Sequence, residues 1–183
     1  MNSLQTILIL AVAFLAVFAE ATVPVVRYWL GAQVDLLPVL MVYAALNTEI
    51  ITVSLLAVLG GLWFDALSAN PLGVSILPLF FVGSLICVRN DLILRDLAFA
   101  RLVLGTVASG LVPVLTVLLL LTAGKQPLLG WGSIWQWLVM TAGGAAATPL
   151  VFALFDWGYR ALGYQPRTET SFRPDREIRR GRL

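Results

Sequence analysis

Long runs of residues without charge are the feature that most constrains this chain. Such runs separate three pairs of charged residues: Asp65 and Arg89, Arg101 and Lys125, and Lys125 and Asp156. A helix needs about 20 mostly apolar residues to cross the hydrocarbon of a bilayer, so several runs are long enough. With 60% hydrophobic and 12% charged residues among 183, a soluble fold would expose much apolar surface to water. We therefore expect an all-α integral membrane protein with about six transmembrane helices.

The boundaries of the expected helices follow from charged and turn-forming residues. The polar residues at 47–49 interrupt about 30 apolar residues, which predicts a short helix followed by a longer one. At a rise of 1.5 Å per residue the short helix reaches only about 16 Å, so it has to be half-buried or shielded by its neighbours. Residues 89–101 suit a short helix at the membrane surface. The six expected segments are Leu4 to about Val26, Leu36–Leu46, Ile50–Leu67, Leu72–Val88, Leu102–Ala123, and Ile134 to about Trp157.

The basic residues predict the orientation. With both termini in the cytoplasm, the inner side receives ten arginines, whereas the outer side receives only Arg27 and Lys125. This asymmetry follows the positive-inside rule and predicts a multi-pass membrane protein with a cytoplasmic C-terminus. Residues 1–163 then form one transmembrane domain. The basic tail at 164–183 is expected to be disordered, either as an anchor on anionic headgroups or as a docking segment for a cytoplasmic partner.

The composition also excludes several kinds of chemistry. The chain has no histidine, which excludes Ser-His triads and imidazole ligands for metals. Its single cysteine, Cys87, can form neither an internal disulfide nor a thiolate metal cluster. A net charge of +2 is too small to predict a nucleic-acid partner. We therefore expect no enzyme activity, no catalytic residues, and no cofactor or metal site.

Asp65 is the main candidate for a functional residue, because a carboxylate inside a membrane segment is costly. It falls near the end of an expected helix, where the helix dipole disfavours an acid. One interpretation is structural: backbone N–H groups between Leu72 and Ser75 could point at the carboxylate. The other is that Asp65 contacts a partner or a ligand. The sequence leaves both interpretations open.

Small residues recur at helical spacing in three of the expected helices, which allows another backbone to approach closely. They can serve packing within the chain or contact with a second membrane protein, and self-association is left open as well. The three sets are Ser54, Ala57 and Gly61; Gly105 and Ser109; and Gly143, Gly144 and Ala147.

Residues 60–73 carry a recognisable motif. Gly60, Gly61, Leu62 and Asp65, followed by Leu72 and Gly73, fit the pattern Gly-x-x-x-Asp-x(6)-Leu-Gly. The segment Leu37–Leu46, with its early proline and its Tyr-Ala-Ala-Leu stretch, also fits the second helix of the same family. The chain therefore resembles the rod shape-determining MreD family over residues 37–88. The Trp63-Phe64 pair is bulkier, and the tail longer, than that family leads us to expect.

The resemblance implies a fold similar to the six-helix substrate-binding subunits of energy-coupling-factor transporters. It implies a non-enzymatic scaffold of the cell-elongation machinery, which builds lateral peptidoglycan, with MreC as the main partner. RodA, its penicillin-binding transpeptidase, MreB and membrane lipids are further expected partners. The motif residues become candidates for partner binding: Gly60, Gly61, Leu62, Asp65, Leu72 and Gly73. The shared architecture leaves an alternative, a membrane subunit that binds a vitamin or another small molecule for a transporter.

Overall fold

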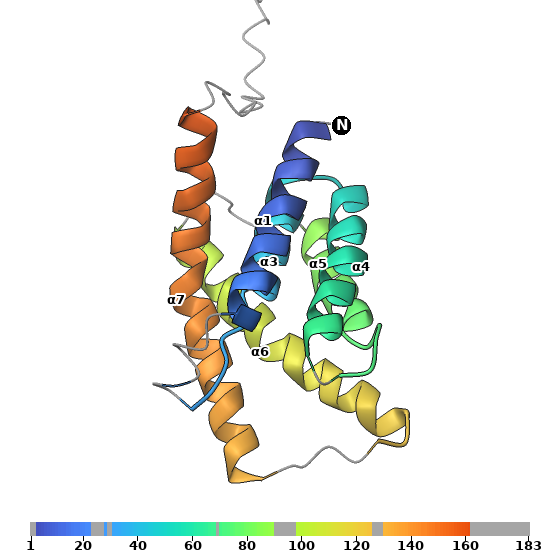
Figure 1. The fold of residues 1–183 in the computed structure, drawn as a ribbon. Coiled ribbons are helices and arrows are strands. Elements are labelled where there is room, and N and C mark those ends of the chain that lie inside the picture. Colours follow the sequence, from blue (N-terminus) through green and yellow to red (C-terminus); the bar gives the residue numbers. More distant parts are fainter. Residues whose placement is uncertain are drawn as a thin grey trace, which may run out of the picture.

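The fold is taken from a computed structural model, which describes residues 3–22, 28, 31–68, 70–89, 98–125 and 130–161. These residues form six helices and no strand, arranged as an elongated bundle (Figure 1). The bundle consists of α1 (Ser3–Thr22), α3 (Leu37–Asn47), α4 (Ile50–Leu67), α5 (Ile76–Val88), α6 (Ala98–Thr122) and α7 (Trp131–Ala161). The all-α fold expected from the sequence is confirmed.

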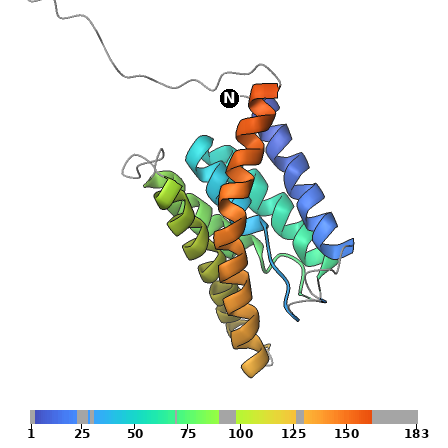
Figure 2. The ribbon, with the colours of Figure 1, turned by 90° about the vertical axis from the view of Figure 1, so that its left-hand side faces the viewer.

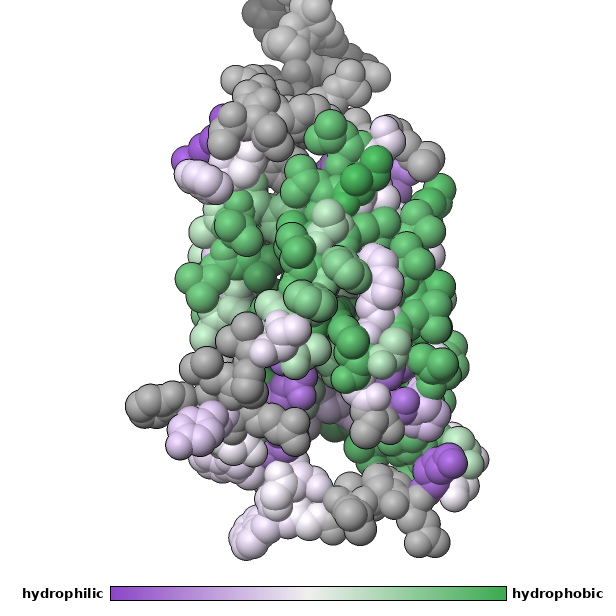
Figure 3. Space-filling model, viewed as in Figure 1, coloured by the Kyte–Doolittle hydropathy of each residue, from purple (hydrophilic) through white to green (hydrophobic). Residues whose placement is uncertain are grey.

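Four of the six helices, α1, α4, α6 and α7, are long and apolar enough to cross a membrane. The other two are shorter: α3 has 11 residues and α5 has 13. Apolar side chains cover the middle of the face in Figure 3, and polar ones gather toward its ends. The expectation of about six spanning helices is therefore supported for four helices.

Several boundaries differ from the expected ones. Helix α5 begins at Ile76 instead of Leu72, because residues 71–75 form a turn. Residues 98–101, assigned from the sequence to a surface helix, are the first turn of α6. The last helix is longer than expected and spans 31 residues. The rest of the expected surface helix, at 90–97, and the tail at 164–183 lie outside the described residues.

Helix α3 lies at the centre of the bundle. All ten residues of Leu37–Leu46 are buried, and it packs against each of the other five helices. A helix of this length is too short to cross a bilayer by itself, and the surrounding helices bury its apolar side chains. The sequence-based expectation that its neighbours shield this short helix is confirmed.

Helices α6 and α7 form an antiparallel pair through interlocking small residues (Figure 2). A side chain at Gly105 would collide with Thr148, and one at Gly144 would collide with Ser109. A Cβ atom at Gly143 would lie 2.6 Å from Val34. The small faces of these two helices are therefore used for packing within the chain, one of the two alternatives that the sequence left open.

Candidate functional site

The motif identified in the sequence builds a corner between α4 and α5. Asp65 lies in the last turn of α4 and is 1% exposed. Its Oδ2 accepts hydrogen bonds from the backbone N–H groups of Gly73 (2.8 Å) and Ser75 (3.1 Å). Its Oδ1 accepts one from the Ser75 hydroxyl at 2.5 Å. The predicted contact between this carboxylate and the amides before the next helix is confirmed.

The electrostatics of this corner compensate for the position of Asp65. An acid at the C-terminal end of α4 is disfavoured by the dipole of that helix. The same carboxylate lies at the N-terminal end of α5, where free N–H groups carry partial positive charge. Ser75 occupies the N-cap position of α5, and its own side chain makes no capping bond there. Asp65 therefore supplies from α4 the acceptor that the start of α5 lacks.

Each glycine of the motif has a packing or conformational reason. At Gly61 a Cβ atom would lie 3.0 Å from the backbone nitrogen of Ile76, so a side chain would push α5 away from α4. At Gly60 it would lie 2.8 Å from Cδ2 of Leu37. Gly73 has a φ of +91°, a conformation that costs an L-residue roughly 1–2 kcal/mol. Gly61 and Gly73 are therefore needed for the corner itself, whereas Gly60 serves the contact of α4 with α3.

Two motif leucines face outward from the corner. Leu72 is 71% exposed and Leu62 is 38% exposed. Trp63 is half-buried and packs edge-on against Phe14 of α1, with ring centroids 5.2 Å apart, so the bulky pair is accommodated between α1 and α4. The six candidate residues thus divide into three that build the corner, one (Gly60) that packs against α3, and two that are free to contact another molecule. Their role in partner binding stays a prediction.

A second acidic site, which the sequence analysis missed, lies at the start of α3. Oε1 of Glu20, in the last turn of α1, accepts the backbone N–H of Leu36 at 2.8 Å. Oδ1 of Asp35 accepts the next N–H, that of Leu37, also at 2.8 Å. Within the described residues, Oε2 of Glu20 is buried without a hydrogen-bond partner. Burial raises the pKa of Asp35 to about 6, although its hydrogen bond from Leu37 acts in the opposite direction.

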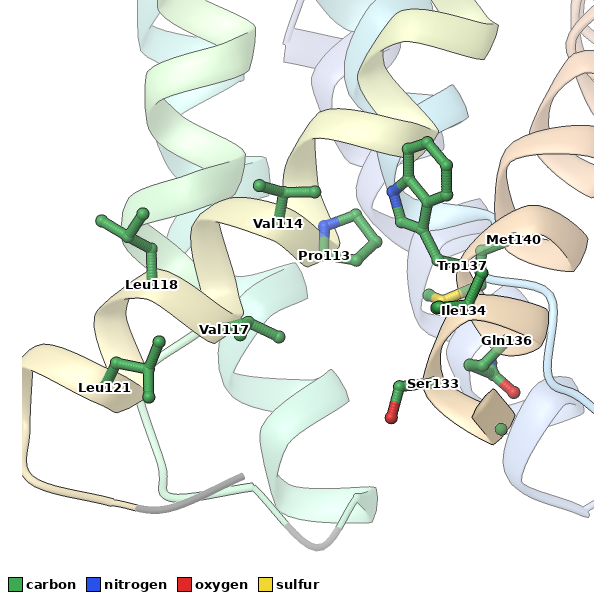
Figure 4. Close-up of a pocket in the computed structure, with 11 residues that line it drawn as sticks. Pro113, Val114, Val117, Leu118, Leu121, Ser133, Ile134, Gln136, Trp137 and Met140 are labelled. Atoms are coloured by element: carbon green, nitrogen blue, oxygen red, sulfur yellow. The ribbon is translucent and has the colours of Figure 1, made fainter. Parts of the chain in front are cut away.

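An open apolar groove lies between α6 and α7 (Figure 4). Its volume is about 600 Å³. Pro113, Val117 and Leu121 line it from α6, and Ile134, Trp137 and Met140 line it from α7. Trp137 also donates a hydrogen bond from Nε1 to the carbonyl of Gly110 at 2.9 Å. The walls can hold an apolar group by shape, and they offer few polar groups for recognising a polar substrate.

The described residues contain no group of three or more histidine, cysteine, aspartate or glutamate side chains that could hold a metal ion. Comparison of the chain with family models, with curated proteins and with solved structures finds no match. The resemblance carried by residues 37–88 therefore stays a prediction, and the functional argument depends on the geometry of this chain alone.

Proposed function

We propose that this chain is a non-enzymatic integral membrane scaffold of the bacterial cell-elongation machinery. In this proposal it lies in the inner membrane with a cytoplasmic C-terminus and binds the single membrane helix of an MreC-like protein. RodA, its transpeptidase and MreB belong to the same assembly. The expected relation to the fold of energy-coupling-factor subunits belongs to the proposal as well. The proposal starts from the resemblance of residues 37–88 to the MreD family.

One observation carries the proposal: the way in which the α4–α5 corner uses its motif. The aspartate and the three glycines are used internally, and Asp65, Gly61 and Gly73 fix the shape of the corner. Leu62 and Leu72 are left at its surface. Helices associate in lipid through close packing, because lipid chains are as apolar as leucine. A rigid corner that presents leucines in a fixed geometry supports contact with another membrane helix.

Site-directed photo-cross-linking tests this proposal. We expect a photoreactive residue at Leu72 to form an adduct with the MreC-like bitopic protein of the same cell. The matched control is Val107, which is 56% exposed on α6, a helix that does not contribute to the corner. The proposal would be contradicted if the residue at Leu72 formed adducts only with other proteins, or if Val107 gave an equal yield of the adduct with the MreC-like protein.

Depletion and mass spectrometry extend the test. Loss of the protein is expected to disturb rod shape, because the lateral wall would lack its scaffold. A vitamin or similar metabolite retained by the purified protein, together with unaltered cell shape on depletion, would favour the transporter-subunit alternative and count against the scaffold.

A further inference from the structure

The groove between α6 and α7 is closed at one end and open at the other. On one side of Pro113 the helices are in close contact, through Gly105 with Thr148 and Ser109 with Gly144. The hydrogen bond from Trp137 to Gly110 ties the helices together just before Pro113. Beyond this point the two helices diverge, and the groove lies between them (Figures 1 and 4). Pro113 and Trp137 therefore form its closed end.

The groove is no longer than one leaflet of a bilayer is thick. From Pro113 to the end of α6 at Thr122 there are ten residues, which correspond to roughly 15 Å at the rise of an α-helix. The hydrocarbon of a bilayer is about 30 Å thick, so this is about half of it. A helix that crosses the membrane alongside α6 and α7 would need a groove through the whole thickness. A lipid acyl chain enters from the headgroup region and ends near the midplane, as this groove does.

A basic residue lies near the open end of the groove. Lys125 follows the end of α6 at Thr122 by three residues, and its N–H donates to the carbonyl of Leu120 at 3.0 Å, next to Leu121 in the groove wall. Its side chain is exposed. The first turn of α7 contains no acidic residue, so the positive end of that helix dipole is not neutralised there. The other charged residues described in this helix pair lie at its opposite end: Arg101, Asp156 and Arg160.

We infer that this groove binds one acyl chain of an anionic phospholipid, with the phosphate at Lys125. An acyl chain gains little by leaving other acyl chains for an apolar groove, so the preference for this lipid has to come from its headgroup. A basic residue near the membrane surface favours an anionic lipid about fivefold. The inference rests on the membrane location in the proposed function, and it is independent of the MreC-like partner.

The test uses the full chain in nanodiscs of equal parts phosphatidylcholine and phosphatidylglycerol. After extraction in a mild detergent, native mass spectrometry counts the lipids that each chain retains. We expect one phosphatidylglycerol per chain. Val117→Phe narrows the groove and is expected to lower this retention, whereas Val107→Phe, on the exposed face of α6, preserves it. Lys125→Gln is expected to lower the ratio of phosphatidylglycerol to phosphatidylcholine about fivefold.

A second measurement avoids detergent. Brominated phosphatidylglycerol in the nanodisc is expected to quench the fluorescence of Trp137, obtained by difference from Trp137→Phe, more strongly than brominated phosphatidylcholine does. Val117→Phe is expected to reduce this difference. Three results would overturn the inference: equal quenching by both lipids, equal lipid retention in the two phenylalanine variants, or an unchanged headgroup preference in Lys125→Gln. A polypeptide recovered in the groove in place of lipid would overturn it too.

Discussion

Removal of the Asp65 carboxylate is expected to destabilise the protein strongly. In Asp65→Ala the backbone N–H groups of Gly73, which is half-buried, and Ser75, which is buried, lose their acceptor. A buried donor left unsatisfied costs about 1–3 kcal/mol and a half-buried one costs less, so the two amides together cost about 2–4 kcal/mol. The hydroxyl of Ser75 can rotate toward another acceptor, so we do not add it to this figure.

Asp65→Asn removes the charge of the side chain and keeps its shape. With its amide oxygen in the place of Oδ2, asparagine still accepts both backbone N–H groups, and its NH2 group can donate to the Ser75 hydroxyl oxygen. What is lost is the charge on the acceptor, about 1 kcal/mol for each of the two backbone hydrogen bonds. We therefore expect a loss of about 2 kcal/mol, which is smaller than the loss in Asp65→Ala.

The free energy of unfolding of both variants can be measured by titrating the purified protein in mixed micelles with a denaturing detergent. Asp156→Asn, at an exposed position of α7, is the matched control and is expected to change it by less than about 0.5 kcal/mol. If Asp65→Ala cost no more than Asp65→Asn, or if both behaved like the control, the carboxylate would not hold the start of α5. The argument for a corner fixed by Asp65 would then fail.

Two further predictions use the same preparation. Gly105→Ala is expected to lower the free energy of unfolding by about 1–3 kcal/mol, because the added Cβ collides with Thr148. Gly132→Ala is the control: nothing lies within 4 Å of its added atom, so the free energy of unfolding is expected to stay unchanged or rise slightly. Equal effects of the two substitutions would contradict the packing argument. Because the pKa of Asp35 is about 6 in the fold and ordinarily 3.8, the folded state holds this proton more tightly, so stability is full below about pH 4 and falls by up to about 3 kcal/mol as the pH rises through 6. Thermal midpoints measured between pH 4 and 8 should decline in the native protein and decline less in Asp35→Asn. Identical pH profiles of the two proteins would refute the raised pKa of Asp35.

Local patterns in the sequence were sufficient to predict part of this architecture. The contact of Asp65 with residues 73–75 spans at most ten positions across a turn at Pro71, so the geometry follows from neighbours in the chain. The shielding of α3 was predicted from its length and its apolar sequence, since a helix of about 16 Å is too short to cross a bilayer by itself. The expected start of α5 at Leu72 is wrong, because the positive φ of Gly73 and the contact of Asp65 with these amides hold residues 71–75 in a turn.

Contacts between distant segments could not be predicted from the sequence. Glu20 and Leu36 are 16 residues apart, and their hydrogen bond depends on how α1 packs against α3. The sequence contains one local signal for a capped helix at this position. Asp35 comes just before an apolar segment that has Pro38 at its start. The groove depends on where α6 and α7 diverge, which lies beyond a contact across 27 residues. The spacing of small residues likewise fits packing within the chain and packing against a partner equally well.

The two acidic sites solve the same structural problem. Helices α3 and α5 are short, so their first backbone N–H groups lie inside the bundle, where they need protein acceptors. In each case the preceding long helix supplies one from its last turn: Glu20 of α1 reaches Leu36, and Asp65 of α4 reaches Gly73 and Ser75. An acid that is costly at the end of its own helix thus stabilises the start of the next. Because both acids serve the backbone in this way, we expect a partner at the α4–α5 corner to contact its exposed side chains, and substitution of Leu72 should weaken that contact without unfolding the bundle.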